Sequence, residues 1–325
     1  MGSGPSSDGK TRRMIMEKKR SGKIGKGSFL RKGFKFSLLF RCLFFVFGAF
    51  FAVQVSAQDL ETLSEQVRSG SVEEKREALF QIRNLESAEA SRAAIAALRD
   101  RSDIVRATAA FSVIFLPPAE AVQSLVPNLK DKSEIVRRET AYALGLVGDP
   151  SATASLLQTL NKDRALEVRT AAAVALGRIG DPSAVDALND ILRRKPRGEE
   201  EFLRRSAARS IGQIAQIVQT GERKVLTPEN FLPDRYKELK RPKYLDLKTQ
   251  IPVFARAAET LKTVLADENE SGDVRREAAF SLGAIGDETA VSLLRSKSDD
   301  KDYYLAEIAQ EALRKIEFLQ QLKNN

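Results

Sequence analysis

The sequence predicts an all-α protein built as a solenoid, a linear stack of helix pairs. The main observation is a recurring motif, seen in Val168–Pro182 (VRTAAAVALGRIGDP), Val136–Pro150 (VRRETAYALGLVGDP) and Val274–Glu288 (VRREAAFSLGAIGDE). Successive copies lie about thirty-one residues apart, except for one longer interval that holds an insertion. This period is typical of stacked repeats, in which each unit buries its apolar face against its neighbours. Looser copies begin at Glu74, Val105, Leu203 and Leu305.

Each copy predicts one helix. In the best copy, Val168, Ala172, Ala173, Leu176 and Ile179 fall on a single helical face, and the alanines keep that face thin enough for neighbouring helices to approach closely.

The end of the motif predicts a turn into the next helix. Gly180 suits a left-handed helix C-cap, Asp181 suits an N-cap and Pro182 suits the first helical turn that follows. The partner helix then runs over Ser183–Leu192, also with helical apolar spacing.

Motif and turn together predict about seven helix pairs in residues 58–325. Asp59–Ser69 and Glu73–Asn84 form the first pair, and the long polar helix at the end of the chain is expected to cap the core. The other pairs cover about 87–116, 118–148, 150–180, 182–218, 251–286 and 288–321.

The motif VRxxAAxALGxIGD resembles the HEAT-repeat family, specifically the phycobilisome-lyase-type HEAT-like repeats. The resemblance spans roughly Asp59–Leu322. It implies a right-handed α-solenoid of antiparallel helix pairs, with the motif helices on the concave side. It also implies a structural ladder of turn hydrogen bonds, in which an Asp stands six residues before the motif Arg, at Asp100 and Arg106, Asp131 and Arg137, and Asp163 and Arg169.

The outward positions of the motif helices are candidate partner contacts. Three units carry an Arg four residues before an aromatic residue, which places the guanidinium beside the ring on a helix. Arg and aromatic residues are enriched at interfaces. The rings could equally be wedges between neighbouring helices. The candidate residues are Arg76, Phe80, Phe111, Arg138, Tyr142, Arg205, Arg209, Arg276 and Phe280.

Residues 1–57 read as a basic leader followed by a signal peptide. The apolar run CLFFVFGAFFAV begins at Cys42, and Val55-Ser56-Ala57 forms a cleavage site before Gln58. The interpretation places the solenoid outside the cytoplasm, in the periplasm or secreted. An uncleaved signal anchor over residues 42–58 and an organelle-targeting leader are the alternatives, and an anchor is the only membrane contact that we expect.

The leader also accounts for the net charge of +9. It holds twelve of the 53 basic residues and two of the 44 acidic ones, so the remainder is nearly balanced at 41 against 42. Overall basicity therefore does not indicate a specific nucleic-acid partner.

Composition restricts the possible chemistry. The sequence has no histidine, and its one cysteine lies in the leader, so a thiol nucleophile, a Ser-His-Asp triad and an ordinary zinc site are not expected. The resembling family includes deoxyhypusine hydroxylase, whose iron site depends on His-Glu pairs, and the lack of histidine argues against that activity. We expect no metal and no cofactor.

Residues 220–250 interrupt the period with a basic, aromatic-containing insertion. A loop of this length is a partner-contacting segment, a packed structural insertion or a disordered stretch. With the arginines upstream it forms a local basic zone suited to an acidic protein surface, an anionic lipid or a polyanion. Its candidate contact residues are Phe231, Tyr236, Lys240, Arg241 and Tyr244.

The sequence alone thus favours an exported, non-catalytic scaffold or adaptor. Its concave face and its insertion would bind a protein partner, an acidic one being a candidate. The alternative is a ligand-cradling enzyme subunit similar to a bilin lyase or isomerase.

Overall fold

The computed structural model describes residues 59–221 and 245–324, and within them it contains helices and turns but no strand. The signal segment and Phe231, Tyr236, Lys240, Arg241 and Tyr244 of the insertion lie outside the described residues. No helix in the described part is both long and apolar enough to cross a membrane.

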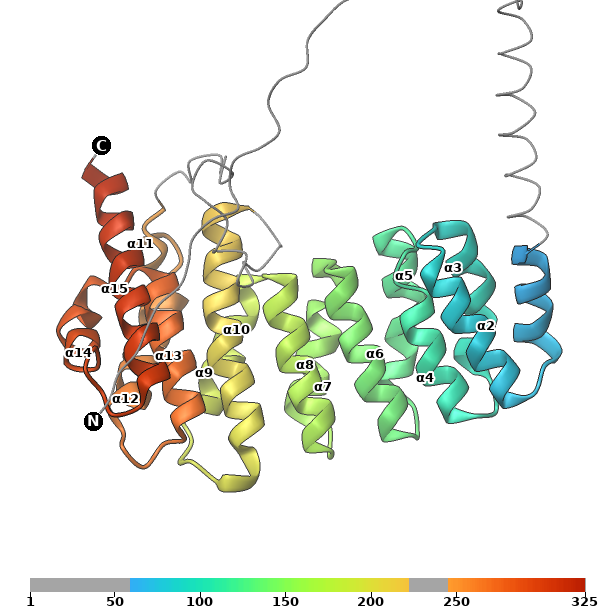
Figure 1. The fold of residues 1–325 in the computed structure, drawn as a ribbon, viewed down its shortest axis with the longest axis horizontal. Coiled ribbons are helices and arrows are strands. Elements are labelled where there is room, and N and C mark those ends of the chain that lie inside the picture. The colour runs from blue at the N-terminus through green and yellow to red at the C-terminus, as the bar shows by residue number, and fades with distance from the viewer. Residues whose placement is uncertain (1–58, 222–244, 325) are drawn as a thin grey trace, which may run out of the picture. The chain divides into compact units, whose positions relative to one another are not determined.

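The motif helices occur where the repeat predicts them and follow one another in chain order (Figure 1). Each packs extensively against the next, more so than the outer helices pack against one another. We call these helices the motif row. They are α2 (Val72–Asn84), α4 (Asp103–Ser112), α6 (Glu134–Val147), α8 (Leu166–Ile179), α10 (Glu201–Thr220), α13 (Gly272–Ile285) and α15 (Tyr303–Asn324).

The outer helices are shorter, and several begin or end in a 3-10 turn. They comprise residues 59–69, α3 (Ala88–Ala94) with η1 (Ile95–Arg99), α5 (Pro118–Leu125) with η2 (Val126–Lys130), η3 (Pro150–Ala152) with α7 (Thr153–Lys162), η4 (Pro182–Ala184) with α9 (Val185–Leu192), α12 (Val253–Ala266), and η8 (Glu288–Ala290) with α14 (Val291–Ser296). Two short elements lie between helices: η5 (Gly198–Glu200) connects α9 to α10 within the fifth pair, and α11 (Leu247–Gln250) precedes α12 of the sixth pair.

The predicted turn chemistry is present. Gly180 caps α8 in the left-handed conformation with φ 78°, and the Asp181 side chain accepts a hydrogen bond from the Ser183 backbone N–H. The same arrangement closes α6 and α13. The turns that the sequence predicts therefore set where each pair ends.

Small residues let the motif helices approach one another. A Cβ added to Gly145 would lie only 2.7 Å from the Cα of Ala175 in the next motif helix, so any side chain there would push α6 and α8 apart. Serine hydroxyls bridge other contacts: Ser210 Oγ donates to the Ala173 carbonyl at 2.9 Å and Ser281 Oγ to the Ala208 carbonyl at 2.6 Å. The leucines of the same faces, Leu144, Leu176 and Leu282, are fully buried.

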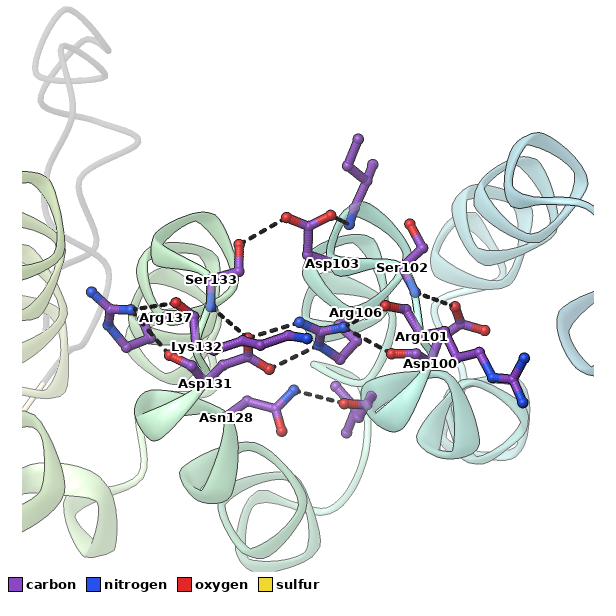
Figure 2. A network of polar contacts seen from close by, with 12 residues as sticks. Asp100, Arg101, Ser102, Asp103, Arg106, Asn128, Asp131, Lys132, Ser133 and Arg137 are labelled. Carbon is purple, nitrogen blue, oxygen red and sulfur yellow. Dashed lines mark hydrogen bonds and ion pairs between the residues drawn. The ribbon is translucent and has the colours of Figure 1, made fainter.

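The turn ladder connects neighbouring repeats (Figure 2). Arg106 Nη1 donates to the main-chain carbonyl of Asp100 in its own turn at 2.8 Å, while its Nε and Nη2 donate to the Asp131 carboxylate of the next turn. Arg137 repeats the pattern with the Asp131 carbonyl and the Asp163 carboxylate. The carboxylate partner is thus the Asp of the next repeat, because the guanidinium spans the gap between two turns.

The last arginine of the predicted ladder departs from the pattern. Arg169 Nε donates to the Leu160 carbonyl at 3.1 Å and lies 3.8 Å from a Glu200 carboxylate oxygen. It does not bond Asp163, whose carboxylate Arg137 already occupies.

The ladder continues across the insertion. Arg204 holds the same motif position and is almost fully buried with Glu270, 66 residues further on. Its guanidinium also donates to the carbonyls of Ile191, Leu192 and Arg194 at the end of α9. The sequence pattern missed this pair because the acidic partner is a Glu beyond the insertion.

Candidate functional site: a groove on the motif row

A groove of about 550 Å³ lies across three consecutive motif helices, α6, α8 and α10. We call it the motif groove. Its walls carry aromatic, aliphatic and charged side chains, which is the usual mixture in sites that bind and orient a ligand. It is lined by Arg138, Glu139, Tyr142, Leu166, Glu167, Thr170, Val174, Glu199, Phe202, Arg205 and Ser206.

The cations of the groove are already paired. Arg138 donates to Glu139 at 2.7 Å, and this hydrogen bond raises the pKa of Arg138, so the guanidinium stays charged. Arg205 donates to Asp273 of α13 at 2.9 Å and stacks 5.1 Å from the centre of the Phe202 ring. Both arginines are thereby oriented before any ligand arrives.

Two carboxylates of the groove have no such partner. Glu167, just before the buried Val168 of α8, and Glu199 of η5 are exposed, and neither makes an ion pair or side-chain hydrogen bond within the described residues. Phe202 beside them is 64% exposed, so an aromatic face is open to a ligand. The groove therefore offers negative charge next to aromatic surface.

The structure brings only part of the predicted partner row together. Arg138, Tyr142 and Arg205 line the groove. Arg76 and Phe80 are exposed on α2, outside it, and Phe111 of α4 lies under the guanidinium of Arg83 at 5.2 Å.

The C-terminal members of the row form a separate ion-paired cluster. Arg209 donates to Glu277 at 2.9 Å, and Arg276 pairs with Asp302 at 2.9 Å. Burial raises the pKa of Glu277 even though Arg209 opposes the shift. Both arginines are ion-paired to the neighbouring repeat, although the Arg209 side chain stays more than half exposed.

The expected stacking of Arg on the aromatic residue four positions later differs from the contacts found. Arg276 lies 5.3 Å from the Tyr304 ring of the next motif helix, and Phe280 faces Lys315 of α15 at 4.9 Å. Burial lowers the pKa of Lys315 at this place. Both side chains therefore contact the neighbouring motif helix and not the residue four positions away on their own helix, because the motif helices are closely packed.

Sequence reasoning missed Glu167, Glu199 and Phe202. Glu167 and Phe202 each stand one residue before the first apolar residue of their motif copy, one helical turn before the outward positions that line the groove. Extending the outward stripe backwards by one turn would have found both. Glu199 precedes α10 in a turn whose conformation the motif does not specify.

Helix pairs stacked through glycine and alanine contacts, joined by a turn ladder, define an α-solenoid of the HEAT type. Family models agree: HEAT repeats match residues 122–212, and the PBS lyase HEAT-like repeat matches residues 274–300. The chain thus contains HEAT repeats and a PBS lyase HEAT-like repeat, as the motif predicts.

The curated relatives are enzymes. The chain is similar to deoxyhypusine hydroxylase of Rattus norvegicus, with 44% identity over 66 residues, and of Homo sapiens, with 43% over 67 residues. These matches cover 20% and 21% of this chain and 22% of each relative, so the similarity spans about a fifth of either protein.

Solved structures of helical repeat proteins also resemble the chain. Human deoxyhypusine hydroxylase in complex with glycerol has a TM-score of 0.38 at 23% identity, covering 82% of this chain and 98% of that one. The complex of CpcE and CpcF of phycocyanin lyase from Nostoc has a TM-score of 0.43 at 22% identity, covering 81% and 94%.

These findings correct two expectations from the sequence. The interpretation as a non-catalytic scaffold or adaptor is wrong, and so is the expectation that the chain has no part in catalysis, because the curated relatives are hydroxylases. The alternative, a ligand-cradling enzyme subunit, agrees better with them.

Proposed function

We propose that this protein is a ligand-cradling subunit of an enzyme and that the ligand lies in the motif groove. The observation that carries the proposal is the open Phe202 ring beside the unpaired carboxylates of Glu167 and Glu199. Since the groove's arginines are held by Glu139 and by Asp273, its available charge is negative.

The groove favours a ligand that joins a cationic amine to an apolar stem. The amine would lie between the two glutamates, and the stem would pack on Phe202, Tyr142 and Val174, because aromatic faces attract cations and cover apolar surface. An anionic ligand would first have to displace Glu139 or Asp273 from an arginine.

Hydroxylation is the reaction class that we propose for the enzyme, since the relatives are named for hydroxylating deoxyhypusine. The residues of this chain do not fit the His-Glu iron site of that family, because the sequence contains no histidine. We therefore assign no catalytic residue here. The groups that perform the chemistry would lie in another part of the enzyme, and this subunit would bind and orient the substrate.

The test uses the full chain and dansylcadaverine, a fluorescent probe with a primary amine on an apolar stem. We expect Glu167→Gln with Glu199→Gln to weaken binding about fivefold to tenfold, and Phe202→Ala to weaken it similarly. Glu307→Gln with Glu317→Gln, at two exposed residues of α15, makes the same change in net charge as the double variant and should bind as the wild type does.

A second probe separates the amine from the lyase-like alternative. If biliverdin, an open-chain tetrapyrrole, binds with an absorbance shift that Phe202→Ala abolishes while dansylcadaverine does not bind, the amine assignment is wrong. Equal dansylcadaverine binding by all the variants would remove the groove as the site.

We also propose, from the sequence pattern, that residues 1–57 direct export and are removed after Ala57, and that the solenoid is right-handed. The intact mass of the exported protein should correspond to a chain that begins at Gln58. A full-length species retained in membranes would instead support the signal anchor over residues 42–58.

A further inference from the structure

A row of exposed cations runs along the turns that join the two helices in three successive pairs, the second to the fourth. In three successive turns the ladder Asp is flanked on both sides by basic residues, giving Arg-Asp-Arg, Lys-Asp-Lys and Lys-Asp-Arg. All six flanking side chains are exposed. We call them the turn ridge: Arg99, Arg101, Lys130, Lys132, Lys162 and Arg164.

The ladder explains why these cations face outward with their charge available. Each central Asp is bonded to a Lys or Arg of the preceding repeat: Asp100 to the half-buried Lys75, and Asp131 and Asp163 to the buried Arg106 and Arg137. The side-chain hydrogen bonds of these carboxylates thus go to the ladder cations, and Lys132 and Arg164 act on Asp131 and Asp163 only through the electrostatic attraction that helps to lower the pKa of each carboxyl. Within the described residues, none of the six makes a side-chain ion pair or hydrogen bond.

The main chain helps to orient the ridge. Arg106 donates to the carbonyl of Arg101 at 3.1 Å, and Arg137 to the carbonyl of Lys132 at 3.4 Å. In Figure 2 the guanidinium of Arg101 lies away from the ladder carboxylates. Arg204 makes the same bond to the carbonyl of Arg194, an exposed cation that continues the pattern one repeat further. The outward direction thus follows from the ladder itself.

A second hollow lies beside the ridge, between the third and fourth helix pairs. It measures about 430 Å³ and is lined by Lys130, Lys132, Lys162 and Arg164 of the ridge. Its two acidic residues are the ladder members Asp131 and Asp163, already bonded. The remaining lining consists of Val126, Leu129, Arg137, Ser155, Gln158 and Thr159. The hollow therefore combines unneutralised positive charge with a small apolar floor.

We propose that the turn ridge binds an acidic segment of a protein partner in an extended, polyproline-II-like conformation. Packed helices lie about 10 Å apart, so the cation pairs recur at about that interval. A polyproline II segment has three residues per turn and rises about 3.1 Å per residue, which places every third side chain on one side at nearly the same interval. A carboxylate at every third residue would then meet one cation pair per repeat.

Polypeptide fits the ridge better than nucleic acid. The described lining of the hollow has no aromatic side chain on which unpaired bases could stack. The chain beyond residue 57 has 41 basic and 42 acidic residues, so it lacks the broad positive field that steers a protein to nucleic acid. The proposal does not depend on the motif groove, because the two sets of lining residues do not overlap.

The test measures fluorescence anisotropy of a labelled peptide of four Glu-Pro-Ala triplets with the full chain. The ridge variant Lys132→Glu with Arg164→Glu should weaken binding about tenfold or more. The control Arg295→Glu with Lys301→Glu makes the same change in net charge at exposed residues of the last repeat and should leave binding nearly unchanged. Both variants should still melt cooperatively, since the hydrogen bonds of the ladder side chains are intact.

Hydrogen exchange locates the peptide independently of the basic leader. We expect protection of residues 126–132 and 155–164 when the peptide is bound. A peptide of the same composition with its glutamates in one block should bind more weakly, because its carboxylates no longer recur at the spacing of the cation pairs. Equal binding by the ridge and control variants would overturn the proposal. So would tighter, ridge-dependent binding of oligothymidine, which would make the partner a nucleic acid.

Discussion

The contact between α6 and α8 and the contact between α10 and α13 are built alike, although residues 148–165 join the first two helices and residues 221–271, which include the insertion, join the second two. In both, a glycine meets the backbone of the next motif helix: Gly145 meets Ala175, and Gly212 meets Ser281. In both, a motif Arg reaches an acidic residue of the next repeat. The helix faces therefore determine the stacking, and the chain connection between them does not.

The two contacts differ in how deeply the ladder pair is buried. The side chains of Arg137 and Asp163 are each 8% exposed, whereas those of Arg204 and Glu270 are 2% and 3% exposed. In the interrupted contact the Arg204 guanidinium also donates to carbonyls at the end of α9, so it is enclosed on more sides than Arg137. Burial makes this pair the more sensitive of the two, because a buried charge without its partner is costly.

The largest expected effect comes from breaking the buried pair. Arg204→Met leaves the Glu270 carboxylate buried without its partner and should lower the free energy of unfolding by about 3–5 kcal/mol. Arg137→Met should cost about 1–3 kcal/mol, since Asp163 is less deeply buried than Glu270; each carboxylate keeps one backbone hydrogen bond, from the Ala165 N–H and from the Ser271 N–H. Urea denaturation of both variants measures the comparison. Equal losses would show that burial does not distinguish the two contacts.

The close approach of the helices provides the next comparison. Gly145→Val and Gly212→Val should each cost about 1–3 kcal/mol, because an added Cβ would lie 2.7 Å from the Ala175 Cα in one contact and 2.9 Å from the Ser281 Cα in the other. Gly198→Val, in the turn before α10 where a Cβ meets nothing within 4 Å, is the control. Thermal melting should show a clear decrease only for the first two.

The two contacts should respond to pH with opposite signs. Burial opposes ionisation of Asp163, but hydrogen bonds from Arg137 and the Ala165 N–H outweigh it and lower the pKa. Stability from this carboxylate is therefore complete above the ordinary Asp pKa and is lost as the pH falls through the lowered value. Asp163→Asn should cost about 1–2 kcal/mol at pH 7 and progressively less toward pH 3.

The stability that Glu277 contributes should depend on pH in the opposite direction. Glu277 pairs with Arg209 between α10 and α13. Burial raises its pKa, so the stability it contributes is present at low pH and is lost as the pH rises through the raised value. Glu277→Gln should therefore gain stability relative to the wild type as the pH rises from about 4 to 7. Melting temperatures of both variants from about pH 3 to pH 7 test both predictions, because the Asp163 effect falls at the acid end of this range and the Glu277 effect above about pH 4.

The smallest effect is expected from the insertion itself. Replacing residues 222–244 by a short Gly-Ser linker should change the free energy of unfolding by about 1 kcal/mol or less, because the entropic cost of closing a loop grows only slowly with its length. Extending the deletion through residue 250 should cost more, since it removes the buried Leu247 and the pair between Lys248 and Asp287 at 2.5 Å. Loss of cooperative melting in the shorter deletion would mean that the insertion is part of the core.

The sequence by itself determined the repeat, the motif helices and their turns. These follow from local chemistry: helical apolar spacing, a glycine at a left-handed cap and an aspartate N-cap all act within a few residues. It also placed Arg138, Tyr142 and Arg205 on the outward stripe that forms the groove.

Only the tertiary structure decided which side chains meet. Glu270 pairs with Arg204 although the two residues are 66 positions apart in the chain. Arg276 stacks on Tyr304 of the next motif helix and not, as the sequence predicts, on Phe280 of its own helix. The groove likewise required α6, α8 and α10 to be set side by side before Phe202 and Glu167 could share one surface. The physical reason is that local propensity shapes each helix, whereas partner choice depends on the distance between packed helices, which small residues on both faces set together.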